Sequence, residues 1–217
     1  MTPSVTLPGT PQVIKLGGSL LTDEVRLHHW LCAILMHGAG SVVVVPGGGQ
    51  YADAVRERQR PQGLTAAQAH EQAIEAMQAM ADDWLRRFKG ICRRADSLAE
   101  VEDLLNAGKV PLAVPKDDWI QAQDITASWD WTSDSLALWL ARHLYASGLL
   151  LVKAVTPQQS WITAQTAHET GIIDAAFPGF LARITMNVAW AGAGQSAGLG
   201  NWMNNQMPGD YCVISAD

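Results

Sequence analysis

Residues 41–49 read SVVVVPGGG, and this stretch indicates the fold class of the chain. Four consecutive valines favour a strand that is covered on both faces, as the strands of a parallel sheet are. Three glycines follow this strand directly. Residues 12–19 read QVIKLGGS, so a second apolar strand carries Lys15 near its end and also stops at glycines. Both glycine turns should therefore lie at the carboxyl edge of one parallel sheet, where such sheets bind ligands.

Alternating helix and strand patterns fill the rest of the chain. Apolar residues at helical spacing predict helices over residues 23–38, 64–89, 97–107, 132–146, 164–170 and 174–183. Short apolar runs predict further strands over residues 91–94, 110–114, 149–154, 184–189 and 211–215. The polar stretch 115–131 is predicted to be an active-site loop, and 192–200 a glycine-rich turn. The alternation predicts an α/β fold, a three-layer α/β/α sandwich with a mainly parallel central sheet, in which residues 1–217 form a single domain.

Composition excludes several classes of function. The net charge of -6 argues against a nucleic-acid or anionic-membrane surface, which needs clustered Lys and Arg. Residues 1–12 lack a basic segment followed by an apolar one, and no apolar run approaches the roughly 20 residues of a membrane span. We therefore expect a cytoplasmic protein. Cys32, Cys92 and Cys212 lie far apart and form no metal-ligand pattern with histidines, so no protein-held metal is expected.

The two glycine turns are typical of anion binding. Glycine lets backbone N–H groups approach a phosphate, and a following helix N-terminus adds partial positive charge. Lys15 would be costly to bury without an anionic partner, which favours a phosphate role over a structural lysine whose charged end reaches solvent. Two other nucleotide motifs are absent from the sequence, the Gly-x4-Gly-Lys-[Ser/Thr] P-loop and the Gly-x-Gly-x-x-Gly dinucleotide turn.

Residues 128–135 read SWDWTSDS and place two carboxylates and several hydroxyls at the start of a predicted helix. Helix capping accounts for one hydroxyl and one aspartate of this group, and leaves the others unexplained. Phosphoryl transfer needs positioned positive charge and groups that hold it. Asp134 could orient Lys15, Asp130 could hold the acceptor, and Lys153 could supply a second positive charge.

Four segments together resemble the amino acid kinase superfamily, which includes acetylglutamate, aspartate, uridylate and isopentenyl phosphate kinases. They read VIKLGGSL (13–20), VVPGGGQYADA (44–54), TSDSLALWL (132–140) and LLLVKAV (149–155). Within the superfamily, SWDWTSDS and AHEQAIEAM (69–77) are most similar to the methanofuran-pathway branch of methanogens and methylotrophic bacteria. Kinases of that branch convert an (aminomethyl)furanylmethyl phosphate to its diphosphate. The resemblance implies an ATP-dependent kinase with Mg²⁺ bridging the nucleotide phosphates, a small phosphate acceptor, and a homodimer.

The resemblance also implies roles for individual residues. The transferring phosphate would contact Lys15, Gly17, Gly18 and Ser19, and Asp134 would organise the catalytic lysines. Lys153 and Thr156 would line the ATP pocket. The acceptor would be held by Gly47, Gly48, Gly49, His70 and Asp130, and Trp129 could stack on a flat ring or a cationic amine. For His70 and Trp129, core packing is about as good an explanation as ligand contact.

One departure from the superfamily concerns a late lysine that neutralises nucleotide phosphates in many members. The corresponding residues 171–180 read GIIDAAFPGF and contain no lysine, so either Lys153 takes this role or activity is reduced. Two alternatives to the phosphate kinase therefore stay open. One is an amino-acid carboxylate kinase, for which only Arg56 and Arg58 could clamp the carboxylate. The other is a catalytically silent nucleotide- or anion-binding protein on the same fold.

Overall fold

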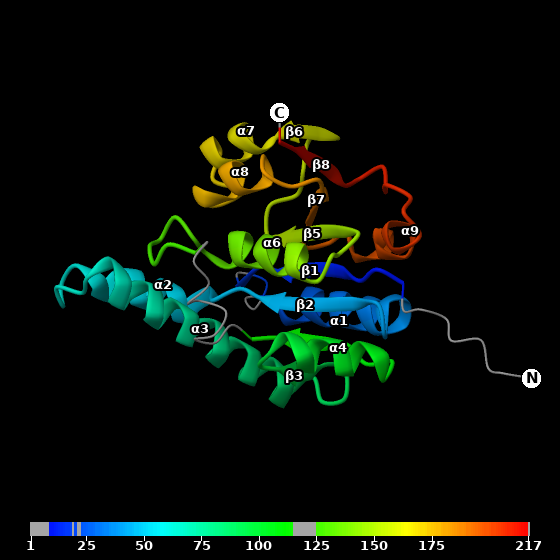
Figure 1. Cartoon of the computed structure of the whole chain (residues 1–217), viewed down its shortest axis with the longest axis horizontal. Helices are drawn as coiled ribbons and strands as arrows, with labels where there is room; N and C mark the ends of the chain where they lie inside the picture. The colour runs from blue at the N-terminus through cyan, green and yellow to red at the C-terminus, as the bar shows by residue number, and fades with distance from the viewer. Residues whose placement is uncertain (1–8, 19, 21–22, 115–124, 217) are drawn as a thin grey trace, which may run out of the picture.

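The computed structural model describes residues 9–18, 20, 23–114 and 125–216. Ser19 lies outside the described residues, as do residues 115–124 of the predicted active-site loop and residues 1–8 of the N-terminal segment. Eight strands form one sheet in the order β3-β4-β2-β1-β5-β7-β8-β6 (Figure 1). Their bounds are β1 Gln12–Leu16, β2 Val42–Pro46, β3 Arg93–Ala95, β4 Pro111–Ala113, β5 Gly148–Lys153, β6 Trp161–Thr163, β7 Asn187–Gly192 and β8 Cys212–Ser215.

The centre of the sheet is parallel, as the valine and glycine pattern predicts. β1 pairs in parallel with β2 on one side and with β5 on the other, so the carboxyl ends of all three strands share one edge. Among the described strand pairs, β7 with β8 is the antiparallel one. The α/β prediction with a mainly parallel sheet is therefore confirmed.

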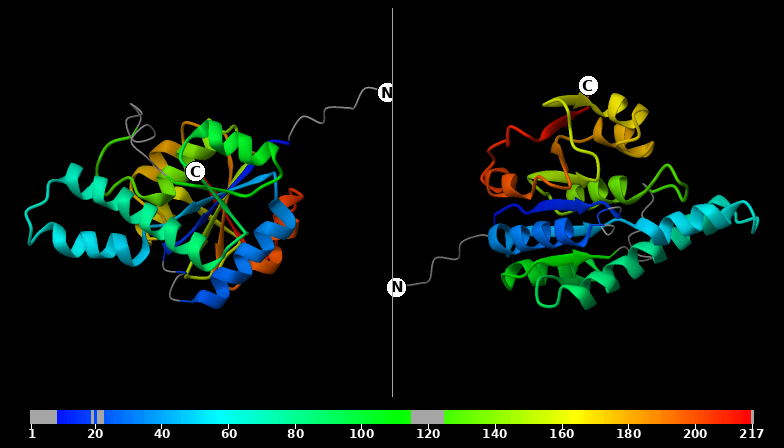
Figure 2. Two further views of the ribbon diagram at one scale, coloured as in Figure 1. Left: turned by 90° about the horizontal axis from the view of Figure 1, so that it is seen from below. Right: turned by 180° about the vertical axis from the view of Figure 1, so that it is seen from behind.

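Helices cover both faces of the sheet. Their bounds are α1 Glu24–Gly38, α2 Gly49–Gln59, α3 Ala66–Arg87, α4 Leu98–Asn106, α6 Ser133–His143, α7 Ala164–Glu169, α8 Ala176–Leu181 and α9 Leu199–Met203, with a short 3₁₀ helix, η2, at Ser196–Gly198. Figure 2 shows α1 and α9 on one face of the sheet and α6 and α8 on the other. None of the helices in the described parts of the chain is long and apolar enough to cross a bilayer.

The valines of β2 show how the sheet supplies two cores. Successive side chains of a strand point to opposite faces. Val43 and Val45 pack in the core under α6 and α8, whereas Val42 and Val44 pack in the core under α1. All four are at most 1% exposed, which explains why the strand is apolar without alternation.

Helices α2 and α3 form a hairpin that extends beyond the edge of the sheet (Figure 1). The sequence predicts α3, which begins at a capping box formed by Thr65 and Gln68. It does not predict α2, because Val55 is the buried residue of that helix and no apolar stripe marks it. β6 and α9 are also missing from the prediction, and β7 begins three residues later than the predicted 184–189 strand.

Candidate active site

A cavity of about 410 Å³ opens at the carboxyl ends of β1, β2 and β5. Walls from α2, α3, the start of α6 and the segment before α8 complete it. Most of the predicted site residues line this cavity, namely Lys15, Gly18, Gly47, Gly48, Gly49, His70, Trp129, Asp134 and Lys153. The topology brings them together because three parallel strands end at one edge.

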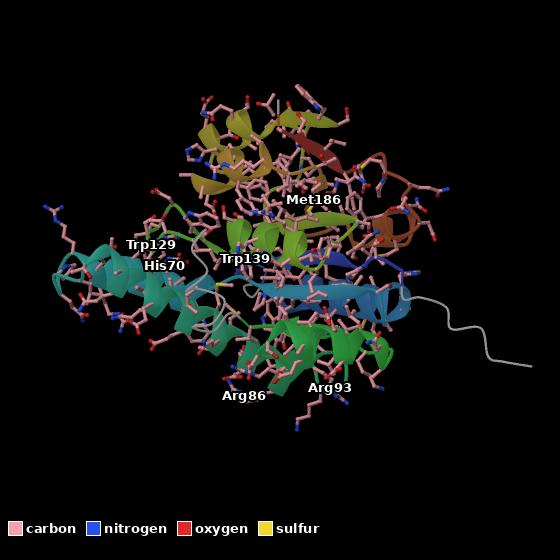
Figure 3. All side chains as sticks on the ribbon, in the orientation of Figure 1. His70, Arg86, Arg93, Trp129, Trp139 and Met186 are labelled. Atoms are coloured by element: carbon pink, nitrogen blue, oxygen red, sulfur yellow. The ribbon has the colours of Figure 1, made fainter. Side chains whose placement is uncertain are left out.

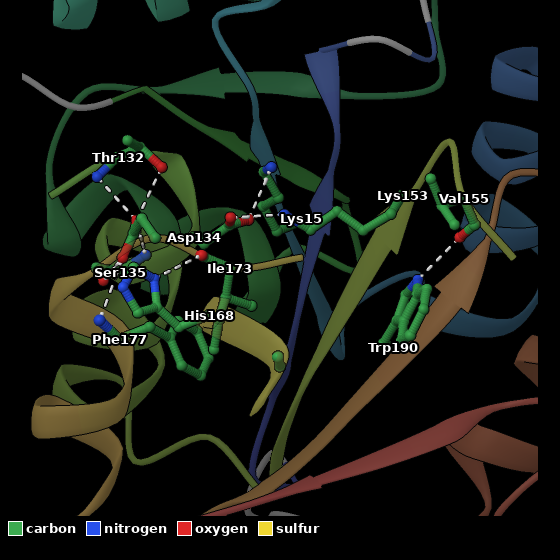
Figure 4. A network of polar contacts seen from close by, with 12 residues as sticks. Lys15, Thr132, Asp134, Ser135, Lys153, Val155, His168, Ile173, Phe177 and Trp190 are labelled. Atoms are coloured by element: carbon green, nitrogen blue, oxygen red, sulfur yellow. Dashed lines mark hydrogen bonds and ion pairs between the residues drawn. The ribbon is translucent and has the colours of Figure 1, made fainter. Parts of the chain in front are cut away.

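At the base of the cavity, Lys15 and Lys153 share the carboxylate of Asp134. Lys15 Nζ lies 2.8 Å from Asp134 Oδ1, and Lys153 Nζ donates to Asp134 Oδ2 at 2.5 Å (Figure 4). The side chains of Lys15 and Asp134 are 6% and 7% exposed, so both charges are desolvated. A buried carboxylate between two ammonium groups leaves this cluster with one net positive charge.

The cluster shifts the pKa values of its members in opposite senses. Burial alone would raise the pKa of Asp134, but the ion pairs with Lys15 and Lys153 outweigh burial and lower it to about 2. Burial lowers the pKa of Lys153 to about 8, because the attraction of Asp134 offsets desolvation and the repulsion from Lys15 only in part. Lys153 is therefore easier to deprotonate than an ordinary lysine.

Asp134 is held in place by the first turn of α6, which is capped from a distant segment. Thr132 is the N-cap residue of α6, but its side chain makes no hydrogen bond to the backbone of this first turn. Instead, the Asp174 carboxylate accepts from Thr132 N at 2.8 Å, from Thr132 Oγ1 at 2.8 Å, from Ser135 N at 3.1 Å and from Ser135 Oγ. Figure 4 shows Thr132, Asp134 and Ser135 side by side in this first turn of α6.

Sequence reasoning missed Asp174. Residues 171–180 are the segment where many superfamily members carry a late lysine, and here this segment places the Asp174 carboxylate in the cavity wall. Burial and the nearby charge of Asp134 raise the pKa of Asp174, while its hydrogen bonds to Ser135 and Thr132 oppose that shift. An aspartate within an apolar run is the one signal that could have drawn attention to it.

The two glycine turns pack backbone against backbone. A Cβ on Gly18 would lie 2.0 Å from Gly49 N, and a Cβ on Gly47 would lie 2.5 Å from Gly18 N. Gly49 also has a φ of 48°, a conformation that side chains disfavour. Glycine is therefore required for the two turns to meet, and their meeting exposes backbone at the cavity. Gly17 is buried behind them, where its N–H donates to Val152 O at 2.9 Å, and it does not line the cavity.

His70 and Trp129 lie at the cavity wall where α3 meets the segment before α6 (Figure 3). His70 is 2% exposed, its Nδ1 lies 3.0 Å from Ser128 O, and its Nε2 has no hydrogen-bond partner among the described residues. Burial lowers the pKa of His70, which favours the neutral ring.

Trp129 Nε1 donates to Gln59 Oε1 at 2.6 Å, and the Arg56 guanidinium lies 4.5 Å from the centre of the Trp129 ring. Arg56 also lines the cavity.

Besides Gly17, two other predicted residues, Asp130 and Thr156, do not line the cavity. Asp130 is exposed, and its backbone is fixed by Asp130 N donating to Ser128 Oγ and by Asp130 O accepting from Ala176 N. These bonds hold the turn so that its side chain faces solvent. Thr156 is exposed beyond the end of β5 and packs over Gly192. Neither residue contacts the lysine cluster through any bond between described residues.

Among the residues that the structure describes, no three His, Cys, Asp or Glu side chains gather closely enough to hold a metal ion. Asp134 and Asp174, which both line the cavity, already have partners: Asp134 contacts the two lysines and Asp174 accepts from the start of α6.

Glycine turns and a lysine pair at the carboxyl edge of a parallel sheet are typical of α/β proteins that bind anions. The amino acid kinase family model matches residues 10–88, which include β1, β2 and both glycine turns. The family-model match and a curated relative confirm the predicted resemblance to the amino acid kinase superfamily.

One curated relative is the [5-(aminomethyl)furan-3-yl]methyl phosphate kinase of Methanocaldococcus jannaschii. The chain is 26% identical to it over 132 residues, a match that spans 61% of this chain and 60% of that protein. Among solved structures, the uridylate kinase from Archaeoglobus fulgidus has a TM-score of 0.68 at 16% identity, covering 94% of this chain and 100% of its own. The UMP kinase from Bacillus anthracis has a TM-score of 0.67 at 15% identity, covering 97% and 98%. These two likenesses support the fold.

Proposed function

We propose that the protein is an ATP-dependent phosphotransferase whose acceptor is a phosphate monoester. The acceptor is of the kind represented by an (aminomethyl)furanylmethyl phosphate, and the product is its diphosphate. The observation that carries this proposal is the pair of Lys15 and Lys153, held on the buried Asp134 carboxylate beside two glycine turns. The 26% identity with a furanylmethyl phosphate kinase supports the choice of acceptor.

In the proposed reaction, an oxygen of the acceptor phosphate attacks the γ-phosphorus of ATP. A P–O–P bond forms, the bond between the γ-phosphorus and the bridging oxygen breaks, and ADP leaves with that oxygen. Charge spreads over the equatorial oxygens in the transition state, so positioned cations are the main requirement. Lys15 and Lys153 meet this requirement because Asp134 fixes both ammonium groups at the cavity base.

The glycine turns would approach the phosphates from the other side. Backbone N–H groups without a Cβ in front of them can donate to phosphate oxygens. Mg²⁺ would neutralise nucleotide charge and would be coordinated mainly by phosphate oxygens and water, as this ion prefers.

The far wall of the cavity suits the rest of the acceptor. Arg56 offers a guanidinium for the existing phosphate, and Trp129 offers an aromatic surface beside it. His70 offers an unpartnered nitrogen at the same wall. The carboxylate-kinase alternative would need a second clamping residue, but Arg58 is exposed and donates to Ala54 O within its own helix.

The proposal is tested by ADP release with Mg·ATP across a panel of acceptors. The panel contains the aminomethylfuran phosphate, isopentenyl phosphate, UMP, acetylglutamate and aspartate. We expect turnover on a phosphate monoester that is lost in Lys15→Ala and kept in Lys109→Ala, an exposed lysine far from the cavity. Turnover on acetylglutamate or aspartate alone would establish the carboxylate kinase instead. ATP binding with no turnover on any acceptor would support the silent binder.

A further inference from the structure

Asp174 joins two parts of the chain that are far apart in the sequence. Its carboxylate accepts four hydrogen bonds from Thr132 and Ser135 at the start of α6, and a fifth from Phe177 N at 3.2 Å at the start of α8. A backbone bond from Ala176 N to Asp130 O at 2.9 Å ties the same two segments together. One side chain therefore determines how the first turn of α6 is placed against the segment before α8.

Asp134 lies within the turn that Asp174 holds. Thr132 and Ser135, which donate to Asp174, flank Asp134 on both sides, so its Cα is fixed by bonds on each side of it. The carboxylate of Asp134 in turn carries both lysine contacts. A shift or rotation of this turn would displace the acceptor oxygens of Lys15 and Lys153 together, because both oxygens belong to one side chain.

Asp174 also acts on Lys153 through its charge. The groups that face Lys153 from the surrounding elements are Asp134 on α6, Lys15 on β1 and Asp174 before α8, and the two carboxylates both favour its protonated form. Asp174 lines the cavity wall beside these groups. Loss of its negative charge should make Lys153 easier to deprotonate.

We propose that Asp174 is a positioning residue for phosphoryl transfer, which holds the first turn of α6 and thereby the Asp134 carboxylate against Lys15 and Lys153. The inference rests on the proposed function, because the lysines are taken as the groups that bind the transferring phosphate. It assigns the segment before α8 a function in a chain whose residues 171–180 contain no lysine. In this chain that segment contributes a carboxylate that orders the lysines supplied by β1 and β5.

The test is Asp174→Asn, which keeps the shape and removes the charge. An amide has one acceptor oxygen and places its NH₂ against backbone N–H groups, so it cannot satisfy the turn. We expect kcat to fall about 10- to 100-fold, the magnitude typical of groups that orient catalytic ligands. The KM values for ATP and acceptor should stay within about threefold, because Asp174 is not assigned to either ligand. In parallel, ¹³Cε-lysine NMR should show Lys153 titrating at lower pH than in the unmodified protein.

Asp103→Asn, at an exposed position on α4, is the matched control and should change none of these values. A second variant, Ser135→Ala, removes one donor and leaves Asp174 charged, so it should lower kcat less and is the test if Asp174→Asn does not fold. Wild-type kcat and an unchanged Lys153 titration in both variants, with only a lower Tm, would overturn the proposal. If the unmodified protein transfers no phosphoryl group, the proposed function fails, whereas the lysine titration still tests the link from Asp174 to Lys153.

Discussion

Lys15 and Lys153 reach opposite oxygens of the same carboxylate from neighbouring strands. β1 and β5 run in parallel with Lys15 opposite Leu151, so Lys153 lies two positions further along the adjacent strand. Asp134 lies in the first turn of α6, and its carboxylate contacts both ammonium groups. The spacing of the two positive charges therefore depends on one aspartate, and the predictions below follow from this dependence.

Asp134→Asn should impair both activity and stability. The amide leaves two buried ammonium groups without a counter-charge, so we expect the free energy of unfolding to fall by about 3–5 kcal/mol. Activity of the folded fraction should fall by about 10²–10³ in kcat, as when a preorganised electrostatic group is lost. Urea unfolding and steady-state kinetics measure the two effects. An unchanged kcat would show that the carboxylate does not organise the lysines for transfer.

Lys153→Arg should change the pH dependence of the reaction. Lys153 has its pKa lowered to about 8, so its positive charge is lost as the pH rises through that value. For the unmodified protein, kcat/KM for ATP should therefore fall above about pH 8, since this parameter reports on the free enzyme. Arginine stays protonated, so in the variant this fall should disappear from the accessible range. A decline at the same pH in both proteins would assign it to another group.

Gly18→Ala should separate the two glycine turns. The added Cβ would lie 2.0 Å from Gly49 N and 2.2 Å from Gly49 Cα, and backbone atoms cannot yield as a flexible side chain can. We expect Mg·ATP affinity to fall at least about tenfold, measured by calorimetry, because the phosphate-facing backbone moves. Gly179→Ala is the control, since a Cβ there has nothing within 4 Å. Equal ATP affinity in the two variants would contradict a phosphate role for the turns.

His70→Asn should weaken binding of the acceptor more than binding of ATP. The asparagine amide can still donate to Ser128 O, but it lacks the Nε2 that has no partner among the described residues. Loss of one buried hydrogen bond to a charged ligand costs about 1.5–3 kcal/mol, so the acceptor KM should rise about 10- to 100-fold. The KM for ATP should stay constant. A larger rise in the KM for ATP than in the KM for the acceptor would assign His70 to the nucleotide site. Unchanged KM values for both would show that His70 is a core residue without a role in binding.

Much of the fold could be predicted because its signals are local. Four valines in a row and glycines at two strand ends are visible without any tertiary information, and they define the sheet centre. Helix α2 could not be predicted because little of it is buried. The predicted strand 184–189 begins before β7 does. The glycine at 192 indicates a turn in the sequence, but in the structure Gly192 is the last residue of the strand.

The candidate site was predictable where strand ends carry its residues. Lys15, Lys153 and the glycine turns follow from the rule that ligands bind at the carboxyl edge of a parallel sheet. Asp174 was not predictable in the same way, because its partners Thr132 and Ser135 lie about 40 residues away. The position of Asp130 depends on backbone bonds that sequence cannot reveal. The roles predicted for Asp130 in acceptor binding and for Thr156 in the ATP pocket stay predictions. Homodimerisation and cytoplasmic location also stay predictions.

The most direct test of the account is ³¹P NMR of the protein with Mg·ATP and the aminomethylfuran phosphate. We predict that the acceptor monophosphate signal will be replaced by two coupled diphosphate signals as ADP appears in equal amount. Lys15→Ala should leave the monophosphate signal unchanged. ADP released together with inorganic phosphate, and no new P–O–P signal, would contradict phosphoryl transfer to this acceptor.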